Sequence, residues 1–446
     1  MLTRFAADYL ADLSLPDFVP APRVSGRLAA YDGLSMEAVG LRLPVGTVCS
    51  VGAEAGRVEA EVIGFRGDRT LLMNLGGPTA LLPNAPVKPV AAHQRGAGEA
   101  EVGASLLGRV VDGAGQPIDG LGPIRGAARW PLAGKHQSPL DRGRVREPLD
   151  VGVRAINGLL TVGQGQRIGI MAGSGVGKSV LLGMIVRAAK ADVIVIGLIG
   201  ERSREVADFL ETKIAGEARS RAVVVAVPAN HSPVLRIRGA LRTHAIAEAF
   251  RAQGKTVLLI MDSLTRVAHA GREIGLALGE PASARGYPPS AIAMLPNLIE
   301  RAGVCARTGG SITAIYTVLA DGDDGNDPVV DSARSILDGH IVLSRALAER
   351  GVYPAIDIGP SVSRVMTDIV GRPHQHAARV LRRHLATYEE NRDLVLMGAY
   401  RQGVDAAIDA AIACQGAIVE YVRQDADEQV TLEDAVAELT GVFGDG

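Results

Sequence analysis

One stretch of this sequence, residues 166–182 (QRIGIMAGSGVGKSVLL), constrains the fold more than any other. Its first part, 167–171, is a short apolar run that is typical of a buried parallel strand. A glycine-rich segment follows at 172–179, and the pattern from Lys178 onward favours a helix. Glycines allow successive backbone N–H groups to point into one concavity, and the helix directs the positive end of its dipole to the same place. The stretch therefore predicts a strand–loop–helix unit that binds a polyphosphate.

The side chains of this P-loop have distinct predicted roles. The Lys178 ammonium can reach the β- and γ-phosphates of a nucleotide, and the Ser179 hydroxyl can ligate Mg²⁺. The alternative is an ordinary glycine-rich turn, but strand, loop and helix follow in the order that a P-loop requires. Ala172 is a departure, because the general pattern has glycine there. The other residues predicted to contact the nucleotide are Gly173, Ser174, Gly175, Val176, Gly177 and Val180.

Composition excludes several classes of protein. The chain has a net charge of −2 and only 3% aromatic residues, which argues against a nucleic-acid-binding surface. Cys49, Cys305 and Cys414 have no metal-ligand spacing, so we expect free thiols in a reducing cytosol. No apolar run is long enough to span a membrane, and the N-terminal residues lack the apolar core of a signal peptide. We therefore expect a cytoplasmic protein that docks on membranes only peripherally.

The pattern of predicted elements divides the chain into four parts. Residues 1–23 combine a short helix, which has one apolar stripe, with a proline-rich linker. This helix has two explanations, packing on its own domain or binding a partner. Residues 24–92 hold short strands and close turns, which predict a small β-barrel. We predict that residues 93–375 form a nucleotide-binding domain with a connector at its start, and that 376–446 form a small helical domain.

Strands and helices alternate in the domain at 93–375, which indicates an α/β fold with a doubly wound, mostly parallel sheet. We predict that the connector, up to residue 149, wraps on this domain and includes a strand at 106–111. The predicted strands of the sheet are 167–171, 192–199, 222–227, 256–261, 311–316 and 340–343. The predicted C-terminal helices are 377–385, 391–396, 404–421 and 432–439.

Two carboxylates follow predicted strands, at the edge where open α/β sheets bind ligands. Asp262 fits a Walker B residue that holds Mg²⁺ through a bound water, although an aspartate there can also cap the next helix. Glu201 fits the group that orients or deprotonates the attacking water. For Arg202 and Arg364, spacing alone favours a surface salt bridge over a catalytic role.

Several segments that occur together and in order resemble one known family. They are 172–179 (AGSGVGKS), 197–206 (GLIGERSREV), 258–266 (LLIMDSLTR), 279–290 (GEPASARGYPPS), 331–345 (DSARSILDGHIVLSR) and 353–364 (YPAIDIGPSVSR). Together they resemble the ATPases of type III protein export, relatives of the rotary ATP synthase α and β subunits, over nearly the whole chain. Within that family, 391–405 (NRDLVLMGAYRQGVD) is more similar to the flagellum-specific members than to the virulence-secretion members.

The resemblance implies a RecA-like P-loop core in a hexameric ring, with ATP sites between subunits and Mg²⁺ as cofactor. It implies that Glu201 is the catalytic carboxylate and that Arg202 contacts the γ-phosphate. It further implies that Arg364 is an arginine finger for the neighbouring subunit's ATP, and that the Tyr353 ring packs on adenine. The implied partners are a stator-like regulator at the N-terminal helix, the export gate, export substrates and their chaperones. The implied location is the inner-membrane export apparatus.

These motifs are compatible with three functions. The leading hypothesis is ATP hydrolysis that energises export of flagellar proteins, with a virulence-type export system as its alternative. A catalytic subunit of a rotary proton-coupled ATPase would need a paired non-catalytic subunit, whereas one chain that carries both Glu201 and Arg364 favours a homo-hexamer. An RNA translocase of related fold is disfavoured by the few aromatic residues and the slightly acidic charge.

Overall fold

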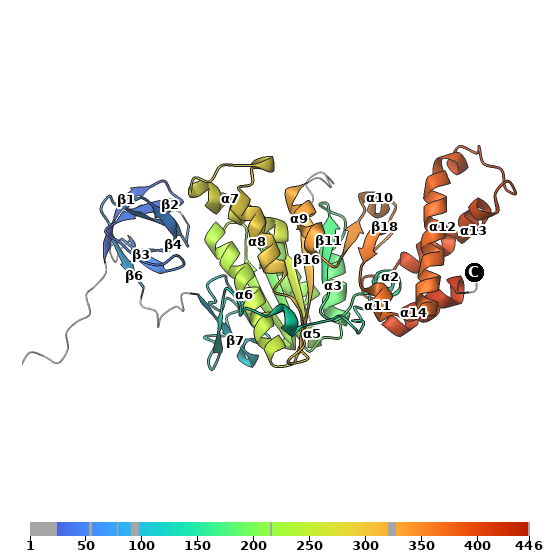
Figure 1. Cartoon of the computed structure of the whole chain (residues 1–446), viewed down its shortest axis with the longest axis horizontal. Coiled ribbons are helices and arrows are strands. Elements are labelled where there is room, and N and C mark those ends of the chain that lie inside the picture. Colours follow the sequence, from blue (N-terminus) through green and yellow to red (C-terminus); the bar gives the residue numbers. More distant parts are fainter. Residues whose placement is uncertain are drawn as a thin grey trace, which may run out of the picture. The chain divides into compact units, whose positions relative to one another are not determined.

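The structure, a computed structural model, describes residues 25–52, 56–77, 79–90, 98–214, 216–319 and 327–444. The described chain forms two compact units, a barrel within residues 25–90 and a larger unit within residues 98–444, to which residues 74–77 are also assigned (Figure 1). The helix that we predict within 1–23 lies outside the described residues. Among the helices that are described, none is long and apolar enough to cross a membrane.

The first unit is the closed β-barrel that the sequence predicts. Its inward-facing side chains, among them Leu28, Met36, Val62 and Leu72, form a core of their own. Closure gives each strand two neighbours, so the barrel has no free edge strand. The strands are β1 (Gly26–Tyr31), β2 (Ser35–Val39), β3 (Val48–Val51), β4 (Val58–Arg66), β5 (Arg69–Asn74) and β6 (Pro86–Pro89), in the order β1-β2-β5-β4-β3-β6.

The second unit is built on a ten-stranded sheet whose main path runs β18-β17-β11-β16-β14-β12-β13-β8. The α/β fold class and the predicted strands are confirmed, and no predicted end differs from the observed one by more than three residues. The parallel strands are β11 (Arg167–Ala172), β12 (Val193–Ile199), β13 (Ala222–Val227), β14 (Thr256–Asp262), β16 (Ser311–Leu319) and β17 (Gly339–Leu343). The antiparallel additions are β18 (Ile356–Ser363) beside β17, β15 (Gly303–Cys305) beside the start of β16, and β10 (Arg142–Gly143) beside β15.

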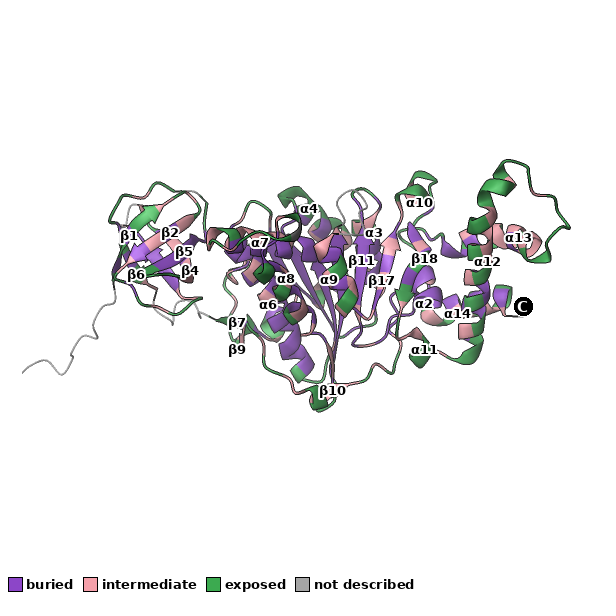
Figure 2. Ribbon diagram, turned by 45° about the horizontal axis from the view of Figure 1, so that its top comes forward, coloured by how far each residue is buried: buried purple, intermediate pink, exposed green. Residues whose placement is uncertain are grey.

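The central strands are continuous apolar runs because helices cover the sheet. All residues of β12 and of β13 are buried, and β-branched side chains suit such strands. Figure 2 shows the strands as the buried layer of this unit. The helices of the unit include α3 (Lys178–Ala188), α4 (Ser203–Asp208), α6 (Pro233–Ala252), α7 (Leu264–Ala277), α8 (Pro289–Ile299) and α9 (Pro328–Ile336).

The connector does more than wrap on the ATPase domain, which corrects our prediction. The predicted strand 106–111 is reduced to β8 (Val110–Val111), and β8 joins the central sheet beside β13. A second strand pair, β7 (Glu99–Val102) and β9 (Ala128–Pro131), stands apart from that sheet. The Trp130 indole N–H donates to Glu248 of α6 at 2.9 Å, so a partly buried polar contact anchors the connector to the core.

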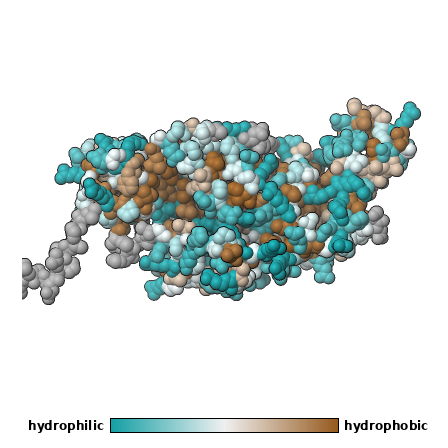
Figure 3. Space-filling model, in the orientation of Figure 1, coloured by the Kyte–Doolittle hydropathy of each residue, from teal (hydrophilic) through white to brown (hydrophobic). Residues whose placement is uncertain are grey.

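The C-terminal helices differ from the prediction at one point. The predicted helices 377–385 and 391–396 are parts of a single helix, α12 (Arg372–Leu396), because no glycine or proline interrupts residues 386–390. The remaining predicted helices are confirmed as α13 (Ala406–Val422) and α14 (Leu432–Phe443). These helices pack on α2 (Arg154–Leu159). Large apolar side chains, which include Leu396 and Met397, are exposed where α12 leads to α13 (Figure 3).

Candidate active site

The P-loop joins β11 to α3 at the carboxyl edge of the sheet. Gly175 and Gly177 have φ values of 80° and 88°, in the left-handed region that favours glycine. Gly177 is the N-cap of α3, and within the described chain no side chain caps this helix end. The first N–H groups of α3 are therefore open to an anionic ligand. Ser179 and Val180 are exposed in the first turn of this helix.

Lys178, Asp262 and Glu201 meet at this edge from three elements. Lys178 begins α3, Asp262 ends β14, and Glu201 follows β12. The Lys178 Nζ lies 2.5 Å from Asp262 Oδ1 and 3.5 Å from Glu201 Oε1. The strands before them run parallel, so their carboxyl ends come together. The structure thus brings together three side chains that the sequence singled out.

Burial and the neighbouring charges shift the pKa values of Glu201 and Lys178. It raises the pKa of Glu201, and the nearby charge of Asp262 raises it further, to about 7. Burial alone would lower the pKa of Lys178, but the charges of Asp262 and Glu201 outweigh burial and raise it. Glu201 Oε1 is buried and accepts no hydrogen bond from the described residues. A buried carboxylate oxygen in this state is suited to accept a hydrogen bond from a water or a ligand.

Thr317 belongs to the site, although our sequence prediction missed it. Its hydroxyl donates to Asp262 Oδ1 at 2.6 Å. The residue lies on β16, between the P-loop strand and the strand of Asp262, in the part that extends beyond the predicted end at 316. A hydroxyl near the carboxyl end of a buried strand was the available signal, because a buried hydroxyl needs a partner.

Tyr353 lies beside the P-loop, on the loop that precedes β18. A Cβ placed on Gly177 would be 3.5 Å from carbon atoms of the Tyr353 ring, which is 45% exposed. The loop after α13 supports it, because the Gln424 N–H donates to the Tyr353 carbonyl at 2.8 Å. Arg187, in the last turn of α3, holds the same loop by donating to the Ala426 carbonyl at 2.5 Å. The Tyr353 ring therefore presents a partly exposed aromatic face beside the P-loop, on which a purine ring could stack.

Two predicted arginines lie outside this cluster. Arg202 is 84% exposed and lies 3.5 Å from Glu205. Arg364 follows β18, and Ser363 of that strand pairs with Gly339, the first residue of β17. Because β17 runs parallel to β11, Arg364 lies at the amino edge of the sheet, opposite the P-loop. Its guanidinium donates to the Arg334 carbonyl at 3.3 Å, so the structure does not bring it to Lys178 of the same chain.

A P-loop at the carboxyl edge of a mostly parallel sheet, with an aspartate at the end of the second strand beyond it, defines the class of P-loop nucleotide-binding proteins. Comparison with protein families narrows this class. Residues 152–363 match the ATP synthase alpha/beta family, nucleotide-binding domain. Residues 370–441 match the T3SS EscN ATPase C-terminal domain.

Individual relatives are similar to this chain in sequence over nearly its full length. It is 49% identical to the flagellum-specific ATP synthase of Pseudomonas aeruginosa, across 98% of this chain and 96% of the relative. It is 44% identical to the type 3 secretion system ATPase of Pseudomonas savastanoi pv. phaseolicola, across 93% of each. The solved structure of the assembled ATPase EscN from the enteropathogenic E. coli type III secretion system matches with a TM-score of 0.88 at 41% identity, across 94% of this chain and 100% of that one. The chain therefore belongs to the type III export ATPases of the ATP synthase α/β family, and it is an ATP hydrolase.

Proposed function

We propose that this chain hydrolyses Mg-ATP to energise type III export of flagellar proteins. The observation that carries the proposal is the buried Glu201 carboxylate, which has an oxygen without a hydrogen bond beside Lys178 and Asp262. Two relatives at 49% and 50% identity are named flagellum-specific ATP synthases, which favours the flagellar system. A virulence-type export system is the second candidate, because a relative at 44% identity is a type 3 secretion system ATPase.

The nucleotide occupies the P-loop in this proposal. Lys178 exchanges its contacts with the two carboxylates for contacts with the β- and γ-phosphates. The Ser179 hydroxyl and the Asp262 carboxylate are the hard oxygen donors that Mg²⁺ prefers, and they would hold the ion. When bound, Mg²⁺ neutralises phosphate charge. Tyr353 supports the adenine, and the backbone cradle is Gly173, Ser174, Gly175, Val176, Gly177 and Val180.

Catalysis uses residues from two subunits. Glu201 orients and deprotonates the attacking water, and Arg202 turns from Glu205 to contact the γ-phosphate. Arg364 acts on the ATP of the neighbouring subunit, because it lies at the edge of the sheet opposite its own P-loop. A head-to-tail contact of this kind, repeated around a closed ring, gives a homo-hexamer. The relative EscN, solved as an assembled ATPase and also in complex with its central stalk EscO, supports an assembly of this kind.

The proposal also divides the chain into four parts and assigns partners to the ring. The parts are residues 1–23, 24–92, 93–375 and 376–446, and the first of them binds a stator-like regulator. The ring docks peripherally at the inner-membrane export apparatus, where it meets the export gate, export substrates and chaperones. The match of residues 370–441 to the T3SS EscN ATPase C-terminal domain supports the last boundary, and the solved complex of EscN with its central stalk EscO supports a protein partner.

Replacing Thr317 with valine is expected to lower kcat about three- to tenfold, because Asp262 loses the hydroxyl that orients its carboxylate. The matched control is Thr313→Val on the same strand, where the hydroxyl accepts from the Gly165 N–H at the opposite edge of the sheet. Both variants lose one buried hydrogen bond, so both should unfold at a lower temperature, while only Thr317→Val should lose turnover. Steady-state ATPase assays and thermal melts check this, and an equal loss of kcat in both variants would contradict it.

The raised pKa of Glu201 predicts the pH dependence of the reaction. The carboxylate must be ionised to accept a proton, and burial together with the charge of Asp262 raises its pKa to about 7. We expect kcat/KM to rise about tenfold per pH unit below 7 and to level off above it. The check is a pH–rate profile at low ATP concentration, with Lys178→Ala as the background. A flat profile through this range would assign the proton acceptor to another group.

The function itself is tested in cells. The chain's gene is deleted in its source organism, and external filaments are counted by electron microscopy. We expect filaments to be lost, to return with the wild-type chain, and to stay absent with Lys178→Ala. Intact filaments in the deletion strain would reject flagellar export and favour the virulence-type system.

A further inference from the structure

A cavity of about 590 Å³ opens at the amino edge of the sheet, far from the P-loop of the same chain. It is lined by the starts of β11 and β17, by β10 and β15, and by the segment that follows β18. Val365, the residue after Arg364, is part of its wall. Its charged lining consists of Arg142, Arg144, Arg146 and Arg167 with Asp338 and Asp368.

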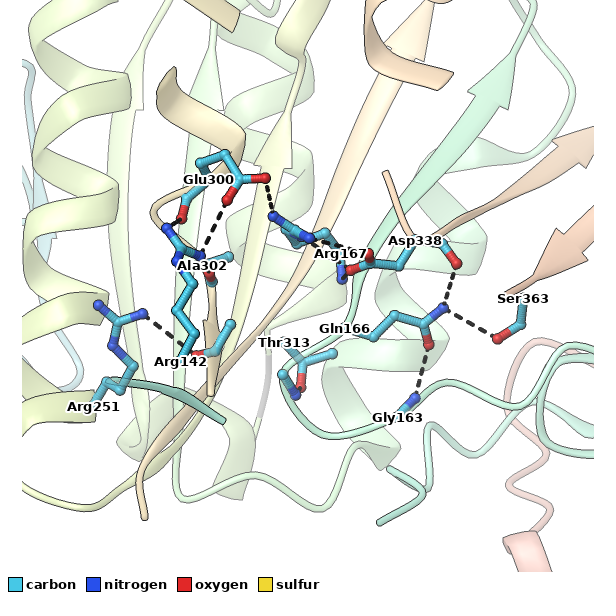
Figure 4. Close-up of polar contacts among 12 residues, drawn as sticks. Arg142, Gly163, Gln166, Arg167, Arg251, Glu300, Ala302, Thr313, Asp338 and Ser363 are labelled. Atoms are coloured by element: carbon cyan, nitrogen blue, oxygen red, sulfur yellow. Dashed lines mark hydrogen bonds and ion pairs between the residues drawn. The ribbon is translucent and has the colours of Figure 1, made fainter. Parts of the chain in front are cut away.

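Two of these arginines, Arg142 and Arg167, form ion pairs within the chain (Figure 4). Arg142 donates to the Glu300 carbonyl at 2.7 Å and forms an ion pair with its carboxylate at 3.1 Å. Arg167 forms ion pairs with Glu300 and with Asp338. Arg144 and Arg146 are exposed and form no ion pair with any described residue. The cavity therefore presents two guanidinium groups that are available to an acidic partner.

An acidic ridge lies at the opposite edge of the sheet, directly after Glu201. Glu205, Asp208 and Glu211 follow one another at intervals of three residues along α4 and the helical turn 209–213, so each of them is close to the next. Asp208 and Glu211 are exposed and lack an ion pair within the described chain. Among the cations here, Arg202 pairs with Glu205 and the Lys213 side chain packs over Gly183 of α3. Arg204 is also exposed on α4.

The position of Arg364 indicates which surfaces of two neighbouring copies face each other, because Arg364 of one copy must reach the phosphate site of the next. Arg364 lies at the amino edge of the sheet, beside β17 and β18, while the phosphate site lies at the carboxyl ends of β11, β14 and β12. The strand order is β18-β17-β11-β16-β14-β12, so the finger must act several strands along that order in the neighbouring copy. The cavity lies at the amino ends of β17, β11 and β16. If the cavity is displaced along the strand order by the same number of strands as the finger, it lies at the end of β12 of the neighbouring copy, where α4 begins.

We propose that this cavity receives the acidic ridge of a neighbouring copy of the chain, with Arg144 and Arg146 pairing with Asp208 and Glu211. This inference rests on the ring that we propose above and names the contact that holds two copies in register. The same contact delivers Arg364 to its target, because Val365 lines the cavity. The pairs cannot form within one chain, because the two surfaces lie at opposite edges of the sheet.

The test measures assembly in a Glu201→Gln background, which keeps Mg-ATP bound. Sedimentation velocity over a range of protein concentrations gives the midpoint of ring formation. Arg144→Glu with Arg146→Glu should raise this midpoint about tenfold or more, and so should Asp208→Lys with Glu211→Lys. All four changes together should bring it back to within about threefold of the parent, because the charges are then exchanged across the contact. The matched control is Arg379→Glu with Arg383→Glu on the exposed side of α12, which should leave the midpoint unchanged.

Distinct results overturn the proposal. An unchanged midpoint for the arginine pair, or a four-residue variant no better than either pair alone, rejects the contact. Stabilisation of the parent by inorganic phosphate that depends on Arg144 and Arg146, with assembly unaffected, reassigns the cavity to a small anion. Failure of the parent to assemble at any concentration rejects the ring itself. Thermal melts of each variant confirm that a shifted midpoint does not reflect misfolding.

Discussion

Replacing Arg364 with alanine is expected to lower kcat about 10³-fold or more, with little change in the affinity for Mg-ATP. The guanidinium lies at the edge of the sheet opposite its own P-loop, so its loss leaves the phosphate cradle of the same chain intact. An arginine finger acts on charge that develops in the transition state, which explains why turnover falls and binding does not. ATPase assays over a range of protein concentrations and a fluorescent nucleotide titration measure the two quantities.

Mixing two inactive variants tests whether Arg364 acts between subunits. Arg364→Ala retains Glu201, and Glu201→Gln retains Arg364, so a ring that contains both has some sites with both groups. Random mixing at equal amounts makes roughly a quarter of the sites complete, and activity should reappear in that proportion. A finger that acted within its own chain would give no recovery, since each chain keeps its own defect.

Arg379→Ala is the matched control for the loss of an exposed arginine. Arg379 lies on α12, where its guanidinium donates to the Gln375 carbonyl, and it takes no part in the site that we describe. Its removal should leave kcat within about twofold of the wild type. If Arg364→Ala behaved in the same way, Arg364 would be a surface residue, as spacing alone suggested.

Local patterns predicted the core of the fold and of the site. The strands that end at Ile199 and Asp262 are continuous apolar runs, which only a sheet covered by helices accommodates. Their acidic neighbours lie beside the P-loop because the carboxyl ends of parallel strands meet at one edge. These rules act over a few residues, so a sequence pattern is sufficient to apply them.

What sequence patterns did not predict depends on contacts between distant segments. Thr317 gains its role from Asp262, on the neighbouring strand. Gln424 supports Tyr353 from a loop after α13, and no local pattern links the two. The position of Arg364 follows from the antiparallel pairing of β18 with β17, which reverses the edge that a parallel strand would give. Such contacts are set by tertiary packing rather than by periodicity.

Replacing Glu201 with glutamine is expected to lower kcat by about 10²- to 10⁴-fold while Mg-ATP stays bound. Glutamine keeps the shape of the side chain but cannot accept a proton from water. The fold tolerates the change, because burial and Asp262 already raise the pKa of Glu201 to about 7, so that the neutral form is well populated near neutral pH. Removing a carboxylate near the γ-phosphate also removes a repulsion, so the affinity for ATP should hold or increase.

Single-turnover assays and gel filtration with Mg-ATP separate the two effects. Glu201→Gln should elute with ATP bound and hydrolyse it slowly, whereas Lys178→Ala should elute without nucleotide, because it lacks the ammonium that reaches the phosphates. Glu217→Gln, an exposed carboxylate in the first turn of α5 (Glu217–Ser220), is the matched control and should turn over normally. The rise of kcat/KM with pH should also disappear in Glu201→Gln, since the group that titrates near 7 is gone. A near-normal rate with the pH dependence retained would show that another residue positions the water, and the buried oxygen of Glu201 would then need a structural explanation.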